Sequence, residues 1–193
     1  MSMSARIAVI QFPGSNCEYE TAEALQAQGM SVEIVRWTIS EVEFHSFDGY
    51  VLPGGFSFQD RVRSGVISAK LEVVSFLDQA NKEGKPILGI CNGCQILAET
   101  GLVPDLAGET RIEMALAPNT KGEDPQGFMC DWMFVTPVNP EKNIFLSQFS
   151  DTDVLPIPIN HGEGHFVLSE LVQAQLPELA SLRYCDSRGG GVF

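Results

Sequence analysis

The stretch Pro86-Ile-Leu-Gly-Ile-Cys-Asn-Gly-Cys-Gln95 decides how the rest of this 193-residue chain is interpreted. Its apolar beginning, residues 86–90, predicts a buried strand, and a helix is predicted from about Gly93 to Thr100 with almost no loop between them. Within it, Gly89-Ile-Cys-Asn-Gly93 is a G-x-C-x-G pattern. This pattern is the thiol version of the G-x-S-x-G elbow, in which a sharp strand-to-helix turn exposes a nucleophile and requires glycine on both sides.

Cys91 is therefore the candidate nucleophile. Backbone N–H groups at the start of the following helix favour its thiolate, and the N–H of Asn92 is the expected first donor of an oxyanion hole. A second donor is expected from Gly54-Gly55, which follow another predicted strand and let the backbone approach closely. Loops at the carboxyl ends of neighbouring parallel strands share one crevice, so both donors can reach one carbonyl.

Apolar runs alternate with helix-like segments on both sides of this stretch. Ser15 and Glu18 form the S-x-x-E pattern of a capping box, which predicts a helix over about Cys17 to Gln28. A second helix is predicted over residues 68–81. This alternation is typical of βαβ units, so we predict an α/β fold with an open, mostly parallel sheet and helices on both faces. The strands predicted for it are residues 6–12, 31–36, 48–52 and 86–90.

Length and composition predict a single folded domain over residues 1–193. Hydrophobic residues make up 44% of the chain and charged residues 19%. The sequence carries neither a signal peptide nor an apolar run of the ~20 residues that cross a membrane, which makes the cytoplasm the expected compartment. A net charge of −13 argues against nucleic acid or an anionic membrane as a partner. After Gly101 the sequence shifts toward β structure.

Cysteine spacing leaves a second interpretation open. Cys91-Asn-Gly-Cys94 is also a C-x-x-C pattern between a strand and a helix, as in thiol-disulfide oxidoreductases. The long strand–helix alternation before it and the flanking glycines favour the elbow. No metal site is predicted, because Cys130, His161 and His165 lack the spacing of zinc ligands.

Four ordered motifs together resemble the glutaminase subunits of phosphoribosylformylglycinamidine synthases, which are class I glutamine amidotransferases with a flavodoxin-like sheet. The resemblance covers about residues 5 to 185. Gly-Ile-Cys-Asn-Gly is shared by such amidotransferases broadly, whereas the first and last motifs are specific to this subfamily. The motifs are Pro13-Gly-Ser-Asn-Cys17, Leu52-Pro-Gly-Gly-Phe-Ser57, Gly89-Ile-Cys-Asn-Gly-Cys-Gln95 and His161-Gly-Glu-Gly164.

The resemblance implies hydrolysis of L-glutamine through a Cys91 thioester, with ammonia supplied to a synthetase subunit in de novo purine biosynthesis. It places Gly54, Gly55, Asn92 and Gln95 at the oxyanion and substrate site. It also implies that ATP and Mg²⁺ bind to the synthetase partner, that a small accessory subunit joins the complex, and that this chain itself binds no cofactor.

The general base is where the sequence departs from the family pattern. The family takes its base and orienting carboxylate from a His-Pro-Glu motif near the C-terminus, and this motif does not occur in the 193 residues. The chain therefore resembles a form truncated before that motif. On the residues alone, His161 and Glu163 are the candidate base and orienter, because i and i+2 share a face of an extended segment. The resemblance implies instead that His161-Gly-Glu-Gly164 is a separate motif that lines the active-site region or the partner interface. A catalytically defective docking module of the same complex is the remaining alternative.

Overall fold

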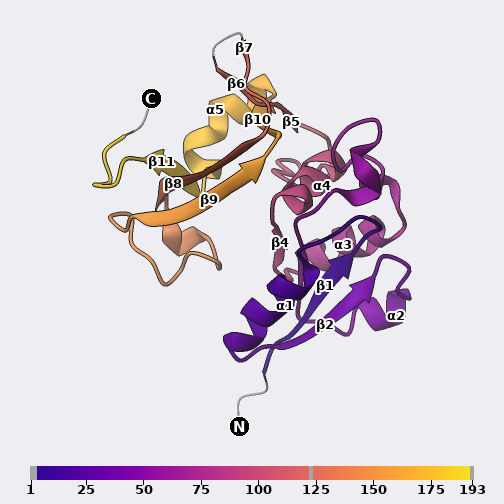
Figure 1. Cartoon of the computed structure of the whole chain (residues 1–193). Coiled ribbons are helices and arrows are strands. Elements are labelled where there is room, and N and C mark those ends of the chain that lie inside the picture. The colour runs from indigo at the N-terminus through magenta and orange to yellow at the C-terminus, as the bar shows by residue number, and fades with distance from the viewer. Residues whose placement is uncertain (1–3, 122–123, 192–193) are drawn as a thin grey trace. The chain divides into compact units, whose positions relative to one another are not determined.

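A computed structural model of the chain describes residues 4–121 and 124–191. This described part divides into two compact units, one reaching to Ala115 and one beginning at Leu116 (Figure 1). The sequence predicts one domain, and that remains a prediction beside these two units.

A parallel sheet forms the centre of the first unit. Among the described residues it has four strands in the order β2-β1-β3-β4. Ile7 of β1 pairs with Val32 of β2 and with Gly49 of β3, and Leu52 pairs with Gly89 of β4. All four predicted strands are confirmed, apart from single residues at their ends. Their bounds are β1 Arg6–Gln11, β2 Ser31–Arg36, β3 Gly49–Leu52 and β4 Ile87–Gly89.

Helices cover both faces of this sheet because β1 is apolar on both sides. Ala8 and Ile10 belong to a core that includes residues of α2, α3 and α4, whereas Ile7 and Val9 pack with Ala22 of α1. Alternate residues of a strand point to opposite faces, so one short strand serves two apolar layers. The predicted fold class is thus confirmed. The helices are α1 Glu18–Ala27, α2 Glu41–Phe44, α3 Val73–Lys82 and α4 Asn92–Thr100.

Two helix predictions need correction. The helix expected over residues 68–81 is divided into a short 3-10 helix, Ser68–Lys70, and α3. The capping box is wrong, because Cys17 is the N-cap of α1 and makes no side-chain cap bond. The Ser15 hydroxyl instead accepts the backbone N–H of Phe12 at 3.1 Å, which closes the turn after β1.

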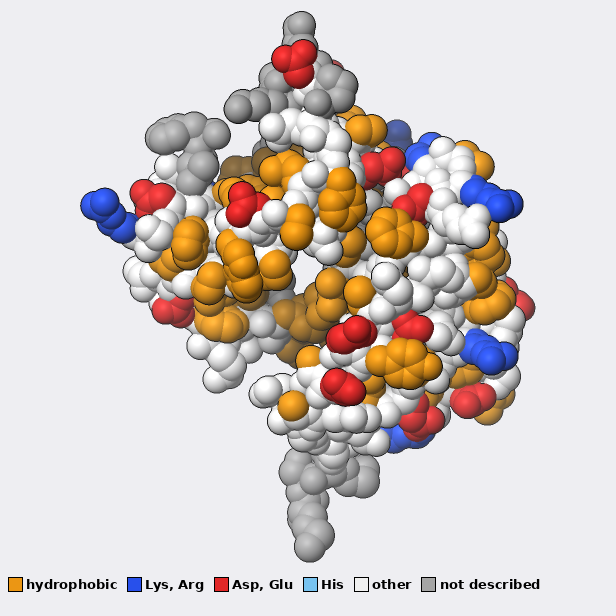
Figure 2. All heavy atoms as spheres, viewed as in Figure 1, with side chains coloured by type: hydrophobic (Ala, Val, Ile, Leu, Met, Phe, Trp, Pro, Cys, Tyr) orange, Lys and Arg blue, Asp and Glu red, His pale blue; other side chains and the backbone are white. Residues whose placement is uncertain are grey.

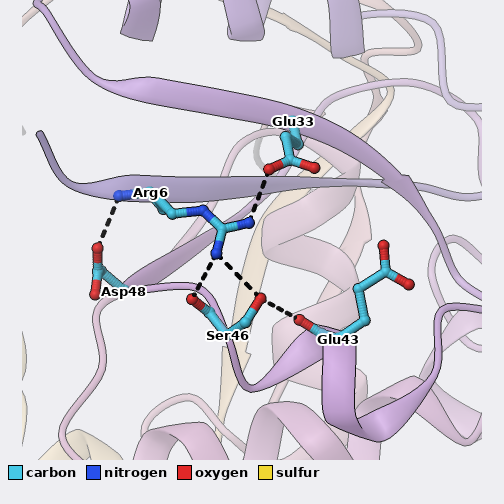
Figure 3. Close-up of polar contacts among 5 residues, drawn as sticks. All are labelled: Arg6, Glu33, Glu43, Ser46 and Asp48. Atoms are coloured by element: carbon cyan, nitrogen blue, oxygen red, sulfur yellow. Dashed lines mark hydrogen bonds and ion pairs between the residues drawn. The ribbon is translucent and has the colours of Figure 1, made fainter.

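Arg6 ties together the ends of the sheet where the parallel strands begin (Figure 3). Its backbone N–H donates to the Asp48 carboxylate at 2.8 Å, and its guanidinium donates to Glu33 at 2.9 Å and to the Ser46 carbonyl at 3.3 Å. These contacts join the start of β1 to β2 and to the segment before β3. The opposite, carboxyl-terminal ends of the strands carry Gly54, Gly55 and Cys91.

The second unit is mainly antiparallel, which agrees with the predicted shift toward β structure. Within the described residues, β8 (Met129–Pro137) pairs with β9 (Leu155–His161) and with β11 (Leu182–Cys185). A further strand, β10 (Glu163–Leu168), pairs with β5 (Met114–Pro118), and β6 pairs with β7 in antiparallel fashion. The helix α5 was not predicted. The remaining elements are β6 Thr120–Lys121, β7 Asp124–Pro125, the 3-10 helices Ser57–Asp60 and Pro140–Lys142, and α5 Glu170–Leu179.

The surface carries many more acidic than basic side chains. On the face shown in Figure 2, Lys and Arg side chains lie singly among acidic and hydrophobic ones, in keeping with the net charge of −13. Over the residues that the structure describes, no helix combines the length and the apolar character that spanning a membrane requires.

Candidate functional site

Cys91 occupies the turn between β4 and α4 in a backbone conformation that non-glycine residues rarely adopt. Its φ is 52° and its ψ is −110°, and it forms the N-cap of α4. Such strained conformations persist only where the surrounding structure enforces them, and they are concentrated at functional sites. The turn has the geometry of the predicted elbow, with the thiol at the start of a helix.

The two elbow glycines are required by close packing. A Cβ on Gly89 would lie 2.7 Å from the carbonyl of Gly93, and a Cβ on Gly93 would lie 2.0 Å from the carbonyl oxygen of Leu52. Real Cβ atoms do not approach backbone atoms this closely, so neither position accepts alanine without movement. The backbone of α4 therefore packs directly against the backbone of β3 and β4, with no side chain between them.

Two backbone N–H groups bond to the Cys91 sulfur, from two different elements. One belongs to Asn92 at the start of α4, and the other to Gly55 in the loop after β3. Gly55 has a φ of 145°, and a Cβ there would lie 2.8 Å from the backbone nitrogen of Asn16. The loops after β1, β3 and β4 thus meet at one place, and two N–H groups point at one sulfur.

The pKa of the Cys91 thiol is raised above its ordinary value. Desolvation by the surrounding atoms is the largest cause, the two N–H bonds act in the opposite direction, and the Asp60 carboxylate raises it further. The N–H groups at the helix start were expected to favour the thiolate, but the net shift of the Cys91 pKa is upward, so this expectation is wrong. Donation from the N–H groups is present, but loss of hydration outweighs it.

Cys17 lies close to the nucleophile. A Cβ on Gly54 would touch both the Cys17 sulfur and the Cys91 Cβ, each at 3.5 Å. The pKa of the Cys17 thiol is raised, by burial first and then by negative charge on Glu20, Cys91 and Glu18. Gly54 therefore packs against both cysteines. The sequence interpretation did not include Cys17 among the site residues.

The side chain of Asn92 is buried and bonded on both of its ends. Its oxygen accepts the Ser57 N–H at 3.1 Å, and its nitrogen donates to Gln95 at 2.9 Å and to Asp60 at 3.3 Å. Gln95, expected at the substrate site, is buried and belongs to this network. Ser57 and Asp60 are further residues that sequence reasoning missed.

His161 and Glu163 lie in the second unit, on either side of a bend at Gly162 that separates β9 from β10. The bend interrupts the extended segment on which the two side chains were expected to share a face, because the chain changes strand partners there. His161 Nδ1 lies 3.1 Å from Asn119 Oδ1, and that oxygen also accepts the Gly164 N–H at 2.9 Å. A carboxamide oxygen only accepts hydrogen bonds, so Nδ1 is the donor in this contact, and in the neutral ring Nε2 is the acceptor.

Asn119 was also missed by the sequence interpretation. It is 5% exposed, and its amide nitrogen donates to the carbonyls of His161 and Gly127 at 2.8 and 3.0 Å. The pairing of His161 with Cys91 remains a prediction, since the two residues belong to different units.

The sequence of this chain is similar to known glutamine amidotransferases. A sequence model described as a CobB/CobQ-like glutamine amidotransferase domain matches residues 4–191. Phosphoribosylformylglycinamidine synthase subunit PurQ of Methanothrix thermoacetophila is 45% identical, over 95% of this chain and 72% of that protein. The chain belongs to the PurQ family of glutamine amidotransferases.

Further members of the PurQ family and a solved structure agree with this assignment. PurQ of Pyrococcus furiosus is 35% identical over 95% of this chain and 73% of its own length. The structure of PurLQS from Thermotoga maritima has a TM-score of 0.79 and 31% identity, covering 97% of this chain and 78% of that one. The family resemblance inferred from four motifs is confirmed, and PurQ membership does not favour the thiol-disulfide or the docking-module alternative.

Proposed function

We propose that this chain hydrolyses L-glutamine at Cys91 as the glutaminase subunit of phosphoribosylformylglycinamidine synthase. The observation that carries the proposal is the Cys91 thiol on a strained elbow with the N–H groups of Gly55 and Asn92 both bonded to its sulfur. Membership of the PurQ family supports the same activity.

The proposed chemistry has two halves. The Cys91 sulfur attacks the side-chain amide carbon of glutamine, and the carbonyl oxygen becomes an oxyanion that the Gly55 and Asn92 N–H groups stabilise. The base takes the thiol proton and passes it to the amide nitrogen, the carbon–nitrogen bond breaks, and ammonia departs while the acyl group stays on Cys91 as a thioester. Water attacks the thioester through a second oxyanion, which releases glutamate and restores the thiol.

The raised pKa of Cys91 makes a proton acceptor important, because the thiol must lose its proton for the sulfur to attack. His161 is our candidate base within the described residues, with Glu163 beside it in the motif. Its Nδ1–H donates to Asn119, so its Nε2 has a lone pair to offer. Asn119 would then orient the His161 ring, which is the role that the sequence interpretation assigned to Glu163.

The proposed partner is the synthetase subunit, which receives the ammonia and binds ATP and Mg²⁺. The T. maritima PurLQS structure supports such a complex. A small accessory subunit and a cytoplasmic location belong to the same proposal. Thioester formation and hydrolysis use a thiol, a base and water, so we propose that this chain itself needs no cofactor.

The test is a glutaminase assay of the chain together with its synthetase partner. Cys91→Ser should abolish glutamate release, whereas Cys130→Ser, which changes an exposed thiol on β8, should leave the rate unchanged. A glutamine-analogue electrophile should label Cys91 when the modified peptide is mapped. Full activity in Cys91→Ser would refute the mechanism, and full activity in Cys94→Ala would exclude a Cys91–Cys94 redox pair.

A further inference from the structure

Asn92 connects the two sources of N–H donation to the nucleophile. Its own backbone N–H bonds to the Cys91 sulfur, while its side chain, with only 2% of the residue exposed, bonds to the loop that carries Gly55. The Ser57 N–H, two residues after Gly55, donates to Asn92 Oδ1 at 3.1 Å. One residue at the start of α4 therefore contacts both the Cys91 sulfur and the loop that carries the second N–H donor.

The loop after Gly55 has a strained backbone that must be stabilised by contacts with neighbouring elements. Three consecutive non-glycine residues, Phe58, Gln59 and Asp60, have φ values of 53°, 61° and 50°. L-residues adopt this left-handed region at a cost, and a run of three persists only when neighbouring groups enforce it. On one side the loop bonds to the turn after β1, where the Phe56 N–H donates to the Gly14 carbonyl at 2.9 Å. Asn92 supplies the contact on the side of α4.

Only a carboxamide meets the demands of this position. The Ser57 N–H requires an acceptor, whereas the carboxylate of Asp60 and the Oε1 of Gln95 require donors, at 3.3 and 2.9 Å. Aspartate would offer acceptors alone and would place a second negative charge beside Asp60. Leucine has a similar size and offers neither, so all three bonds would be lost and the buried Ser57 N–H would lose this acceptor.

We propose that the Asn92 side chain is a positioning residue that holds the Gly55 N–H at the Cys91 thiol. This role is separate from direct donation by the Asn92 backbone. Its catalytic consequence rests on the proposed glutaminase function, whereas its effect on the thiol does not. We call the bonds from the Asn92 side chain to Ser57 and Asp60 the clamp. When the clamp is lost, the Gly55 N–H moves away from the Cys91 sulfur, and its hydrogen bond no longer lowers the pKa of the thiol.

The experiment measures the thiol and the turnover in parallel. Iodoacetamide alkylation of Cys91 is followed against pH by peptide mapping, and kcat and KM for glutamine are measured with the synthetase present. In Asn92→Leu the alkylation midpoint should move to higher pH, and kcat should fall by about 10²-fold, the usual effect of losing one oxyanion donor, with KM nearly unchanged. Asn81→Asp, on the exposed side of α3, is the control and should match the unmodified chain.

An exchanged pair separates positioning from general damage. Asn92→Asp with Asp60→Asn keeps the local charge, keeps an acceptor for the Ser57 N–H and restores a donor–acceptor pair between positions 92 and 60. Of the Asn92 side-chain bonds, it loses the donation to Gln95. It should recover most of the rate and the alkylation midpoint. An unchanged midpoint and kcat in folded Asn92→Leu, or an exchanged pair no better than Asn92→Leu, would overturn the proposal.

Amide hydrogen exchange decides the matter if the variants fail to fold. In the unmodified chain the Ser57 N–H should exchange slowly, and exchange as fast as in an open loop would overturn the clamp. If the unmodified chain shows no Cys91-dependent glutaminase activity, the proposed function fails, while the alkylation and exchange results still judge the inference.

Discussion

Gly93 packs against Leu52 so closely that a Cβ at residue 93 would lie 2.0 Å from the Leu52 carbonyl oxygen. The first turn of α4 thus rests directly on the backbone of β3. The nucleophile and the loop after β3 owe their proximity to this contact between two elements that lie far apart in the sequence.

Gly93→Ala should therefore lower the free energy of unfolding by about 3 kcal/mol, since the helix must move away from β3. Gly84→Ala is the control, because Gly84 has a φ of 77° but open space around its Cβ. It should lose about 1 kcal/mol, from backbone strain alone. Urea denaturation measures both, and equal losses would contradict the packing argument.

Gly54→Ala should separate activity from stability. The new methyl would meet the Cys17 sulfur and the Cys91 Cβ at an ordinary van der Waals distance of 3.5 Å, so the fold should persist. The methyl would, however, stand beside the nucleophile and displace glutamine, lowering kcat/KM by up to about 10²-fold. An unchanged melting temperature with the lower rate is the expected result. A wild-type rate would show that the substrate approaches from another side.

Alkylation of Cys91 should depend on pH with a midpoint above that of a cysteine in a short peptide. Only the thiolate reacts, and burial raises the pKa of this thiol more than the two N–H bonds lower it. The rate should therefore be low near neutral pH and rise as the pH increases through the raised pKa. Cys130 in the same chain is the internal reference in peptide mapping. A Cys91 midpoint below that of the model peptide would contradict the assigned balance.

The ion pair between Arg63 and Glu99 should contribute measurably to stability. The two nitrogens of Arg63 bond to the Glu99 carboxylate at 2.7 and 2.5 Å, and the Glu99 side chain is 4% exposed. Arg63→Met leaves a buried charge and should cost about 2 kcal/mol, less than for a fully buried pair because Arg63 is half exposed. Adding Glu99→Gln should recover part of this loss in urea denaturation. A double variant no more stable than Arg63→Met would contradict this.

The sequence predicts the elbow well because its constraints are local. Glycine at positions 89 and 93 follows from the sharpness of the turn, and the strands of the parallel sheet follow from apolar runs of the right length. The first turn of α1 was harder, since Ser15 has the chemistry of a cap but bends back to Phe12. The helix α5 escaped prediction because Pro177 interrupts its pattern.

The contacts beyond the elbow depend on relationships that spacing does not reveal. Ser57 and Asp60 both reach Asn92 because the two residues between them, and Asp60 itself, adopt left-handed backbone conformations. Asn119 reaches His161 through strand pairing across 42 positions in the chain. The balance of effects on Cys91 could not be predicted either, because desolvation depends on three-dimensional packing.

Helix α4 is attached to the segment after β3 at both of its ends. Asn92 bonds to Ser57 and Asp60 from the first turn, and Glu99 bonds to Arg63 from the last. A segment anchored at two points along one rigid helix has little freedom to swing as a lid. In the proposed mechanism the Gly55 N–H is therefore held beside Cys91 before glutamine binds, so little reorganisation energy is needed as negative charge develops on the substrate carbonyl.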